Sequence, residues 1–368
     1  MRALLGRLHA LGIGTAWAFC LFTLSSVASA QELHLSYRQV ALQVSDLARS
    51  TKFYAELFGL EPAMRTSSAD FSLGSDVSFL LMQAPEGAAP KIAWIGLAAQ
   101  QRGAQGATDL PRSRLTGLLN DAGFRAAEPD SRQRGLAQAR TYWSARVFDD
   151  EAFFFADAEG IPFRVMSGNC IHCDSNSAQQ SVSNGAIEAL GINHFTNFVS
   201  NAPRSNQLLK QLFGLGILSY QGPNAPTLSL GDGRQFLMYF GTGNPREPEV
   251  AGVTDHVSLA VEDFNVAALQ SRLEDLGLQA GSGTRPPQPL RHWLSLRMVN
   301  RGGAEEGTPE LYFSDPDGIA IQLQDKSYCG GSGYLGDQCP ALELLHAAVL
   351  CALEALMTAA MHEINWVC

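Results

Sequence analysis

The amino-acid sequence predicts an α+β fold of two tandem domains, each an open, cleft-like sheet built from paired βαβββ modules. A repeat relates residues 40–50 to residues 195–205 with an offset of 155 (195 minus 40). In each repeat, alternating apolar and polar residues indicate strands, and the helical segments between them end at glycine. Each repeat closes with an Asp-x-x-Gly turn, at residues 157–160 and 315–318, which is typical of a hairpin.

The second repeat shows these elements most clearly. Its expected elements are a strand at 194–199, a helix at 204–213, a strand at 256–261, a helix between Asp263 and Leu276, and a hairpin of strands 310–314 and 319–324. The expected division of the chain is a signal peptide at 1–30, a first domain at 36–167, a linker with a Cys-x-x-Cys motif at 168–189, a second domain at 190–326, and a cysteine-containing loop and helix at 327–368.

These motifs, in this order, resemble the vicinal oxygen chelate superfamily, which includes glyoxalases, bleomycin-resistance proteins and extradiol dioxygenases. The resemblance rests on the Phe-Gly-Leu helix ends at 58–60 and 213–215 and on the Asp-Pro-Asp-Gly turn at 315–318. It covers residues 36–326, and four modules in one chain are similar to the two-domain extradiol enzymes. The resemblance implies a divalent metal and a small oxygenated substrate.

Carried over residue by residue, the resemblance implies His194, His256 and Gln322 as metal ligands. The residue pattern agrees, because Gln322 lies on the strand face opposite Ile321 and Leu323, which should pack on helices. Two imidazoles and one oxygen suit Fe, Zn, Mn or Ni, and open coordination positions would admit a bidentate substrate. The alternative is that both histidines are ordinary strand residues.

This sequence departs from the family at Gln322, where a glutamate is usual. A neutral amide binds a divalent ion more weakly than a carboxylate does. Glu310 is a candidate compensating acid because it shares a strand face with Tyr312, which matches a cleft tyrosine of the extradiol enzymes. We take Glu310 and Tyr312 as candidate catalytic residues, although the start of a strand favours a solvated Glu310.

A further strand, around residues 291–298, carries the candidate substrate-binding residues. Arg291, Trp293 and Arg297 share one face and indicate an anionic substrate, with surface salt bridges as the alternative. His292 shares the other face with Leu294, Leu296 and Met298, which is expected to be the core side. The resemblance to extradiol enzymes implies an acid–base histidine a few residues before the strand that carries Tyr312. Residues 301–309 contain no histidine, so extradiol ring cleavage would lack that residue.

The first domain has Gln39, Trp94 and Arg164 at the three ligand positions. Tryptophan does not ligate metals and arginine repels them, so we expect this domain to be metal-free. A structural role is favoured over a ligand pocket that would use Arg146 and Arg164 as anion partners.

The N-terminus has the pattern of a secretory signal peptide, with two early arginines, an apolar run from Leu11 to Leu24, and Ala28-Ser29-Ala30 as the cleavage site. That run is shorter than the roughly 20 residues of a membrane span. We therefore expect a secreted or periplasmic protein with no transmembrane span after cleavage. Removing Arg2 and Arg7 takes the formal charge from -10 to -12 (-10 minus 2), which argues against nucleic acid as a partner.

Export permits disulfides, and Cys20 is the only one of the seven cysteines inside the signal peptide. Cys329 and Cys339 flank a glycine-rich loop and are expected to bond. Cys170 and Cys173 could form a local disulfide, a redox pair or half of a metal clip, and structural bonding is the expected outcome.

Residues 341–368 read as a helix with one polar stripe, which could pack on a partner chain and form a homo-oligomer. Two functions remain open at this point. The first is a metal-dependent dioxygenase or lyase that acts on a small oxygenated molecule, anionic or aromatic. The alternative is a non-catalytic protein of the bleomycin-resistance type that binds and sequesters a small molecule.

Overall fold

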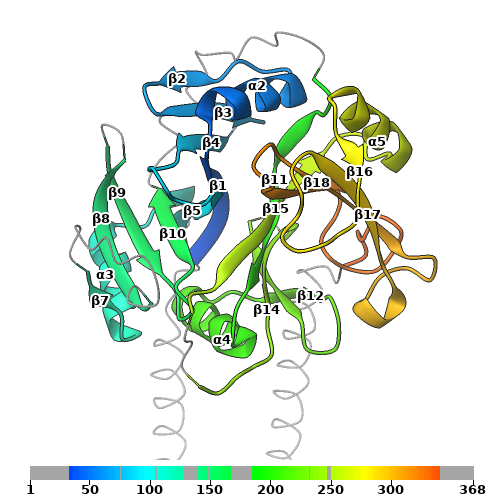
Figure 1. Ribbon diagram of the computed structural model, residues 1–368. Coiled ribbons are helices and arrows are strands. Elements are labelled where there is room, and N and C mark those ends of the chain that lie inside the picture. The colour runs from blue at the N-terminus through cyan, green and yellow to red at the C-terminus, as the bar shows by residue number, and fades with distance from the viewer. Residues whose placement is uncertain are drawn as a thin grey trace, which may run out of the picture.

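The computed structural model of the protein describes residues 33–74, 76–103, 106–127, 139–147, 150–166, 185–231, 233–246 and 250–339. Two mixed sheets lie side by side, one in blue to cyan-green and one in green to orange, with helices packed on them (Figure 1). The expected signal peptide at 1–30, the Cys170–Cys173 motif and the expected helix at 341–368 lie outside the described residues.

The first sheet is formed by strands that run from residue 33 to residue 166, in the order β2-β3-β4-β1-β5-β10-β9-β8-β7, with β6 paired to β5. Its elements are β1 (Leu33–Val44), α2 (Leu47–Phe58), β2 (Ala63–Arg65), β3 (Ser68–Leu73), β4 (Val77–Gln83), β5 (Lys91–Gly103), β6 (Gly106–Asp109), α3 (Arg112–Asp121), β7 (Arg125–Ala126), β8 (Thr141–Val147), β9 (Asp150–Ala156) and β10 (Pro162–Met166).

The second sheet repeats this order as β12-β13-β14-β11-β15-β19-β18-β17-β16. Its elements are β11 (Ala189–Phe198), α4 (Ala202–Phe213), β12 (Ile217–Tyr220), β13 (Pro226–Leu230), β14 (Gln235–Phe240), β15 (Val253–Val261), α5 (Val266–Asp275), β16 (Gln279–Ala280), β17 (Arg291–Arg297), the short 3-10 helix η2 (Val299–Arg301), β18 (Thr308–Ser314) and β19 (Ala320–Asp325). The two sheets confirm the predicted α+β fold of paired βαβββ modules.

Within each sheet, the two modules meet at their first strands. β11 is antiparallel to β15, and each of these strands also has a parallel partner from its own module, β14 or β19. β1 and β5 repeat this arrangement with β4 and β10. The four central strands of the second sheet therefore carry His194, His256 and Gln322 side by side.

Helices α2 and α4 begin and end with the same kinds of capping residue. The side chain of Asp46 accepts a hydrogen bond from the Arg49 backbone N–H at 3.0 Å, and Asn201 caps α4 in the same way. Gly59 and Gly214 end the two helices with φ of 66° and 68°, a left-handed conformation that side-chain-bearing residues rarely adopt. The expected helix after Asp263 is α5, and it begins later because Asn265 is its capping residue.

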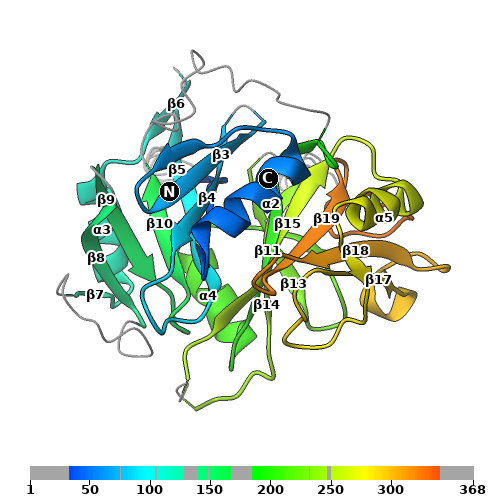
Figure 2. The same ribbon diagram turned by 45° about the horizontal axis from the view of Figure 1, so that its top comes forward.

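One continuous hydrophobic core joins the two sheets. The Tyr37 ring of β1 packs edge-on against Phe195 of β11, with ring centroids 5.1 Å apart. Phe155 and Phe213 also meet across this boundary, at 5.8 Å. Figure 1 shows β1 and β11 in the middle of the molecule, and Figure 2 shows β11 there from another side. The domains are therefore held in a fixed relation by their packing.

None of the helices in the described part of the chain is long and apolar enough to cross a membrane.

Candidate functional site

One face of the second sheet carries a row of side chains that crosses six strands. Residues in register on neighbouring strands project to the same face. From β14 to β17 the row is Phe236, His194, Ser258, Gln322, Tyr312 and Trp293. His256 lies next to this row, paired with Thr196 and Ala320. The structure thus brings His194, His256, Gln322, Tyr312 and Trp293 onto one face.

His194 is buried, with its ring held on both sides. Nδ1 lies 2.7 Å from Oδ1 of Asn193, an oxygen that can only accept, so Nδ1 carries the proton and Nε2 keeps its lone pair. The imidazole stacks on Phe236 with centroids 4.3 Å apart. Burial, and then the neighbouring His256, lower the pKa of His194 well below its ordinary value, so the ring is neutral.

His256 repeats this arrangement from the other module. Its Nδ1 lies 2.7 Å from Oδ2 of Asp255, which also pairs with Arg285 at 2.9 Å. The buried Nε2 has no hydrogen-bond partner among the described residues. The His194 and His256 rings meet nearly at right angles, with centroids 5.6 Å apart. Two imidazoles therefore share one buried space.

The residue before each histidine reaches the ring because of a bulge in its strand. In the β11–β15 ladder, Asn193 is the extra residue on β11 and Asp255 is the extra residue on β15. A bulge disrupts the alternation of side chains and so lets two consecutive residues approach the same face. Carboxylate or amide oxygens on the distal imidazole nitrogen are typical of metal-binding histidines. Strand alternation missed both residues, and the only signal is an Asn or Asp directly before each His.

Gln322 completes the candidate donor set. It is buried, and Oε1 makes no hydrogen bond in the described part of the protein, although a side-chain contact with His194 partly offsets the lowered pKa of that histidine. Unpartnered buried polar atoms are rare in folded proteins. No group of three or more His, Cys, Asp or Glu side chains among the described residues could hold a metal, so a metal here would depend on the neutral Gln322. The available atoms fit a divalent ion as two imidazole nitrogens and one amide oxygen.

Glu310 is buried, which corrects the expectation of a solvated residue at the start of a strand. It is 2% exposed, and Oε1 accepts a hydrogen bond from Nε of Arg297 at 3.1 Å. The hydroxyl of Tyr312 lies 3.5 Å from Oε2. Burial, and then the charge of Glu310, raise the pKa of Tyr312 well above its ordinary value, so its hydroxyl keeps its proton. The carboxylate therefore lies buried on the same strand face as Tyr312.

The faces of β17 are also corrected. Leu294, Leu296 and Met298 are 41%, 48% and 42% exposed, whereas Trp293 and Arg297 point inward. His292 is buried as expected, on the helix side, with Nε2 3.2 Å from Glu274 of α5. The helix covers only this end of the strand, so the apolar residues beyond it face outward.

Two of the candidate substrate-binding arginines already have partners. The Arg297 guanidinium is completely buried and also donates to the backbone oxygen of Gly331 at 2.8 Å. Arg291 donates to Gln279 at 2.7 Å at the edge of the sheet. Sequence reasoning missed Arg285, whose side chain is 37% exposed beside Asp255 and lies over the Phe198 ring. Arg285 is also paired, with Asp255, but it is the most exposed of the three arginines and so the best placed for an anionic group.

In the first domain, the equivalent positions bond to one another. Oε1 of Gln39 accepts hydrogen bonds from Nε1 of Trp94 at 2.9 Å and from Arg164 at 3.0 Å. Both bulges are present, with Arg38 and Ala93 as the extra residues. The fold is thus duplicated, but neither bulge supplies an oxygen acceptor. The expectation that this domain holds no metal stays a prediction.

The aromatic pair beside the site occurs in both domains. Trp293 stacks on Tyr312 at 5.3 Å with an interplanar angle of 3°, and Trp143 stacks on Phe154 at 5.5 Å and 7°. In the second domain, Tyr312 also meets the His256 ring edge-on. A flat, buried aromatic pair therefore lies next to His256.

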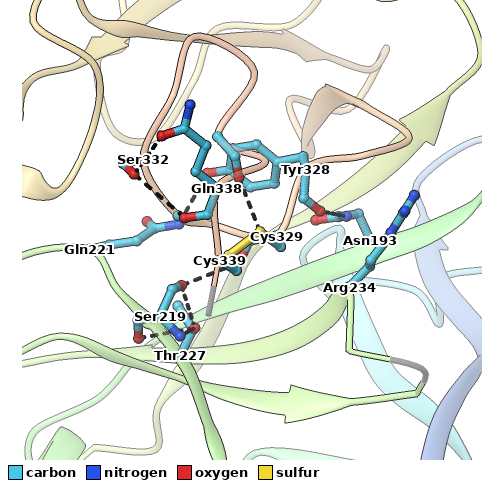
Figure 3. The surroundings of a disulfide bond; sticks show 12 residues. Asn193, Ser219, Gln221, Thr227, Arg234, Tyr328, Cys329, Ser332, Gln338 and Cys339 are labelled. Carbon is cyan, nitrogen blue, oxygen red and sulfur yellow. Dashed lines mark hydrogen bonds between the residues drawn. A yellow bond between two sulfur atoms is a disulfide. The ribbon is translucent and has the colours of Figure 1, made fainter. Parts of the chain in front are cut away.

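The expected disulfide between Cys329 and Cys339 is present. It closes a loop that folds back over the second sheet after β19 (Figure 3). Tyr328, directly before this loop, is completely buried against His194, with ring centroids 5.7 Å apart. The last described residues of the chain thus cover one side of the candidate site.

Comparison with known proteins gives the following relationships. Residues 36–126 match the sequence model of the Glyoxalase/Bleomycin resistance protein/Dioxygenase superfamily. No curated protein matches the chain. The Mn(II)-bound glyoxalase from Novosphingobium aromaticivorans is similar in structure, with a TM-score of 0.54, 19% identity, and coverage of 80% of this chain and 83% of that one.

Two extradiol enzymes are similar to the same extent. Homoprotocatechuate 2,3-dioxygenase from Arthrobacter globiformis has a TM-score of 0.53 and 15% identity, over 81% of each chain. A variant of the same enzyme from B. fuscum has a TM-score of 0.52 and 17% identity, over 81% of this chain and 74% of that one. At these identities, the likeness is one of fold.

Proposed function

We propose that the chain is a member of the vicinal oxygen chelate superfamily, whose sequence model matches residues 36–126, and that its second domain is a divalent-metal-dependent enzyme site for a small oxygenated molecule. His194, His256 and Gln322 would hold the metal, with Fe, Zn, Mn or Ni as candidates for a site of nitrogen and oxygen donors. When bound, the metal would supply Lewis-acid chemistry toward two substrate oxygens.

The observation that carries this proposal is the pair of anchored imidazoles. Asn193 and Asp255 hold the Nδ1 atoms of His194 and His256, each at 2.7 Å. This leaves Nε2 of His256 and Oε1 of Gln322 buried without hydrogen-bond partners in the described part of the protein. A buried lone pair that has lost its hydrogen bonds to water and has no protein partner costs free energy. A bound cation would offset that cost.

The neighbouring side chains support a role in proton handling. Glu310 is a cleft carboxylate, and its Oε2 lies 3.5 Å from the Tyr312 hydroxyl. The protonated Tyr312 could donate to a substrate oxygen, and Glu310 could then hold a proton taken from the substrate. Arg297, at 3.1 Å, would keep the carboxylate oriented.

The proposed substrate class follows from the side chains around the candidate ligands. Trp293 and Tyr312 form a flat aromatic surface beside His256, which suits a planar or aromatic molecule. Arg285 adds a partly exposed positive charge at the same end, suited to an anionic substituent. The candidate substrate is therefore a small aromatic or anionic molecule with neighbouring oxygens.

A second candidate function is a non-catalytic binding protein of the bleomycin-resistance type. It is favoured by the replacement of the usual glutamate with Gln322 and by the ion pair that already engages Glu310. In that case, the aromatic wall would bind a ligand without any metal.

We also propose that the protein works outside the cytoplasm, as a secreted or periplasmic protein. The Cys329–Cys339 disulfide supports this location, since such bonds persist in oxidising compartments.

The test is elemental analysis of the purified protein beside a His194→Ala/His256→Ala double variant. His292→Gln is the matched control, because His292 is equally buried but lies on the helix side of the sheet. We expect about one metal per chain in the wild type and in the control, and loss of that metal in the double variant.

Retention of metal by the double variant would contradict the proposed ligands. A metal-free wild type with a cooperative thermal transition would contradict the enzyme proposal. Ligand binding that persists in a chelator would then support the binding protein instead.

A further inference from the structure

The segment 327–339, which we call the strap, covers the candidate site. Its Tyr328 ring is completely buried and lies 5.7 Å from the His194 ring and 6.0 Å from Phe236. The Arg297 guanidinium lies 5.7 Å from the same ring. Tyr328 thus fills the space between the histidine and the buried ion pair.

The strap is held by side chains that come from the sheet. Nδ2 of Asn193 donates to the Tyr328 backbone oxygen at 2.7 Å, and Gln221 donates to the Tyr328 hydroxyl at 3.0 Å. Ser219 donates to the Cys329 oxygen at 3.2 Å, as Figure 3 shows. Thr308 donates to the Gly333 oxygen at 2.7 Å.

Two of the residues that hold the strap also set the geometry of the site. Asn193 binds the Tyr328 oxygen with its amide nitrogen and His194 with its amide oxygen. Arg297 binds the Gly331 oxygen with one nitrogen and Glu310 with another. Moving the strap would therefore loosen both the histidine and the carboxylate.

The disulfide keeps this glycine-rich loop folded. Four of the residues between the cysteines are glycines, Gly330, Gly331, Gly333 and Gly336. A Cβ on Gly336 would lie 2.5 Å from the Tyr328 ring, so the loop packs tightly on that ring. An uncross-linked segment rich in glycine gains much conformational freedom when it leaves the sheet. Cys329 is buried, whereas Cys339 is partly exposed.

We propose that the strap is a redox-sensitive cover of the candidate site, a regulation that rests on the proposed function of the site. A thiolate of a small dithiol attacks Sγ of Cys339, and the bond to Cys329 breaks. The second thiolate of the dithiol then displaces Cys339, which leaves two protein thiols and an oxidised dithiol, with two electrons and two protons transferred. Tyr328 is then free to leave His194, which exposes the candidate site.

The experiment compares the wild type with a Cys329→Ser/Cys339→Ser variant, each with and without a dithiol reductant. Amide hydrogen exchange is measured for peptides from β11 and from the strap, and mass spectrometry records which cysteines are reduced. We expect reduction to speed exchange in both regions by about tenfold, and the variant to exchange at the fast rate with or without reductant.

A metal-loss assay provides the second readout. Reduction should speed removal of zinc by a chelator by about tenfold in the wild type and leave the variant unchanged. Unchanged β11 exchange in protein whose Cys329–Cys339 bond is fully reduced would overturn the proposal. If the protein holds no zinc but exchange still responds to reductant, the cover stands and the proposed metal function fails.

Discussion

The hydroxyl of Tyr239 donates a hydrogen bond to Oδ2 of Asp157 at 2.6 Å, and this bond joins the second domain to the closing turn of the first. The reciprocal bond runs from Tyr54 of α2 to Oδ2 of Asp315 at 3.2 Å. In both turns, Oδ1 of the aspartate accepts two backbone N–H groups of its own turn. The closing turns of the repeat are therefore also its inter-domain joints.

These joints predict a pH-dependent stability. Burial raises the pKa of Asp157 to about 6 and that of Asp315 to about 7. An unfolded aspartate titrates near 3.9, so the folded state holds more protons as the pH rises from about 4 to about 7. The free energy of unfolding should fall over that interval, by on the order of 3 kcal/mol for each group.

The check is urea denaturation at pH 5 and pH 8 of the wild type and of an Asp157→Asn/Asp315→Asn variant. Asparagine keeps the oxygen that accepts the backbone hydrogen bonds but does not titrate. The variant should lose most of the pH dependence, and equal pH dependence in both proteins would argue against these two groups.

Two ion pairs flank these joints and should differ in strength. Arg204 contacts Glu159 at 2.6 Å with the two side chains 15% and 0% exposed, whereas Arg49 contacts Asp317 with the two side chains 48% and 4% exposed. Removing one partner of a buried pair costs about 3–5 kcal/mol, and solvent around an exposed partner lowers that cost toward the roughly 1 kcal/mol or less of a surface pair. Arg204→Met should therefore lower the free energy of unfolding more than Arg49→Met.

Chemical denaturation of both variants at one pH makes this comparison. The two arginines occupy equivalent positions of the repeat, with an offset of 155 (204 minus 49), so each serves as the control for the other. Equal losses of the free energy of unfolding would mean that the exposure of the arginine does not determine how strongly each ion pair stabilises the protein.

The repeat and the strand alternation predicted the sheet elements, and the family resemblance, with which the alternation agreed, supplied the three candidate ligands. His194, His256 and Gln322 lie on one face because the alternation holds from His256 to Ser258 and from Ala320 to Gln322, beside the bulges. Alternation was wrong on β17, where Leu294 and Leu296 are as apolar as a core face but extend beyond α5. Which face of a strand is covered depends on where a helix stops, and the pattern within the strand does not contain that information.

Asn193, Asp255 and the strap escaped prediction for related reasons. A bulge adds one residue to a strand without changing its composition, so the anchors of the histidines were invisible in the alternation. The burial of Tyr328 depends on contacts with residues as distant as Asn193 and Gln221. Such long-range packing becomes clear only in three dimensions.

Restoring the family's carboxylate should strengthen the metal site. In Gln322→Glu, an oxygen donor at the same position gains a negative charge beside two imidazoles. We expect divalent-metal affinity to rise by about tenfold or more, and the metal-free protein to be less stable because an unpaired carboxylate is buried. Zinc titration and thermal melting with and without metal would measure both effects.

Gln324→Glu is the control for that change, because Gln324 is equally buried on the same strand face, two residues along. It should destabilise the protein without raising metal affinity. Equal gains in affinity from the two variants would mean that only the added charge matters and that Gln322 is not a ligand.

The bulge residues should control metal affinity without touching the metal. Asp255→Ala removes the oxygen 2.7 Å from Nδ1 of His256 and frees the ring to turn. Loss of such a partner typically lowers metal affinity by about 10–100-fold. Asp255→Asn keeps an oxygen acceptor on the same stem and should retain most of the affinity, and Asn193→Ala and Asn193→Asp form the matching pair at His194. Zinc titration of the four variants tests this, since a purely structural role would lower stability in the alanine variants but leave the affinity of the remaining folded protein unchanged.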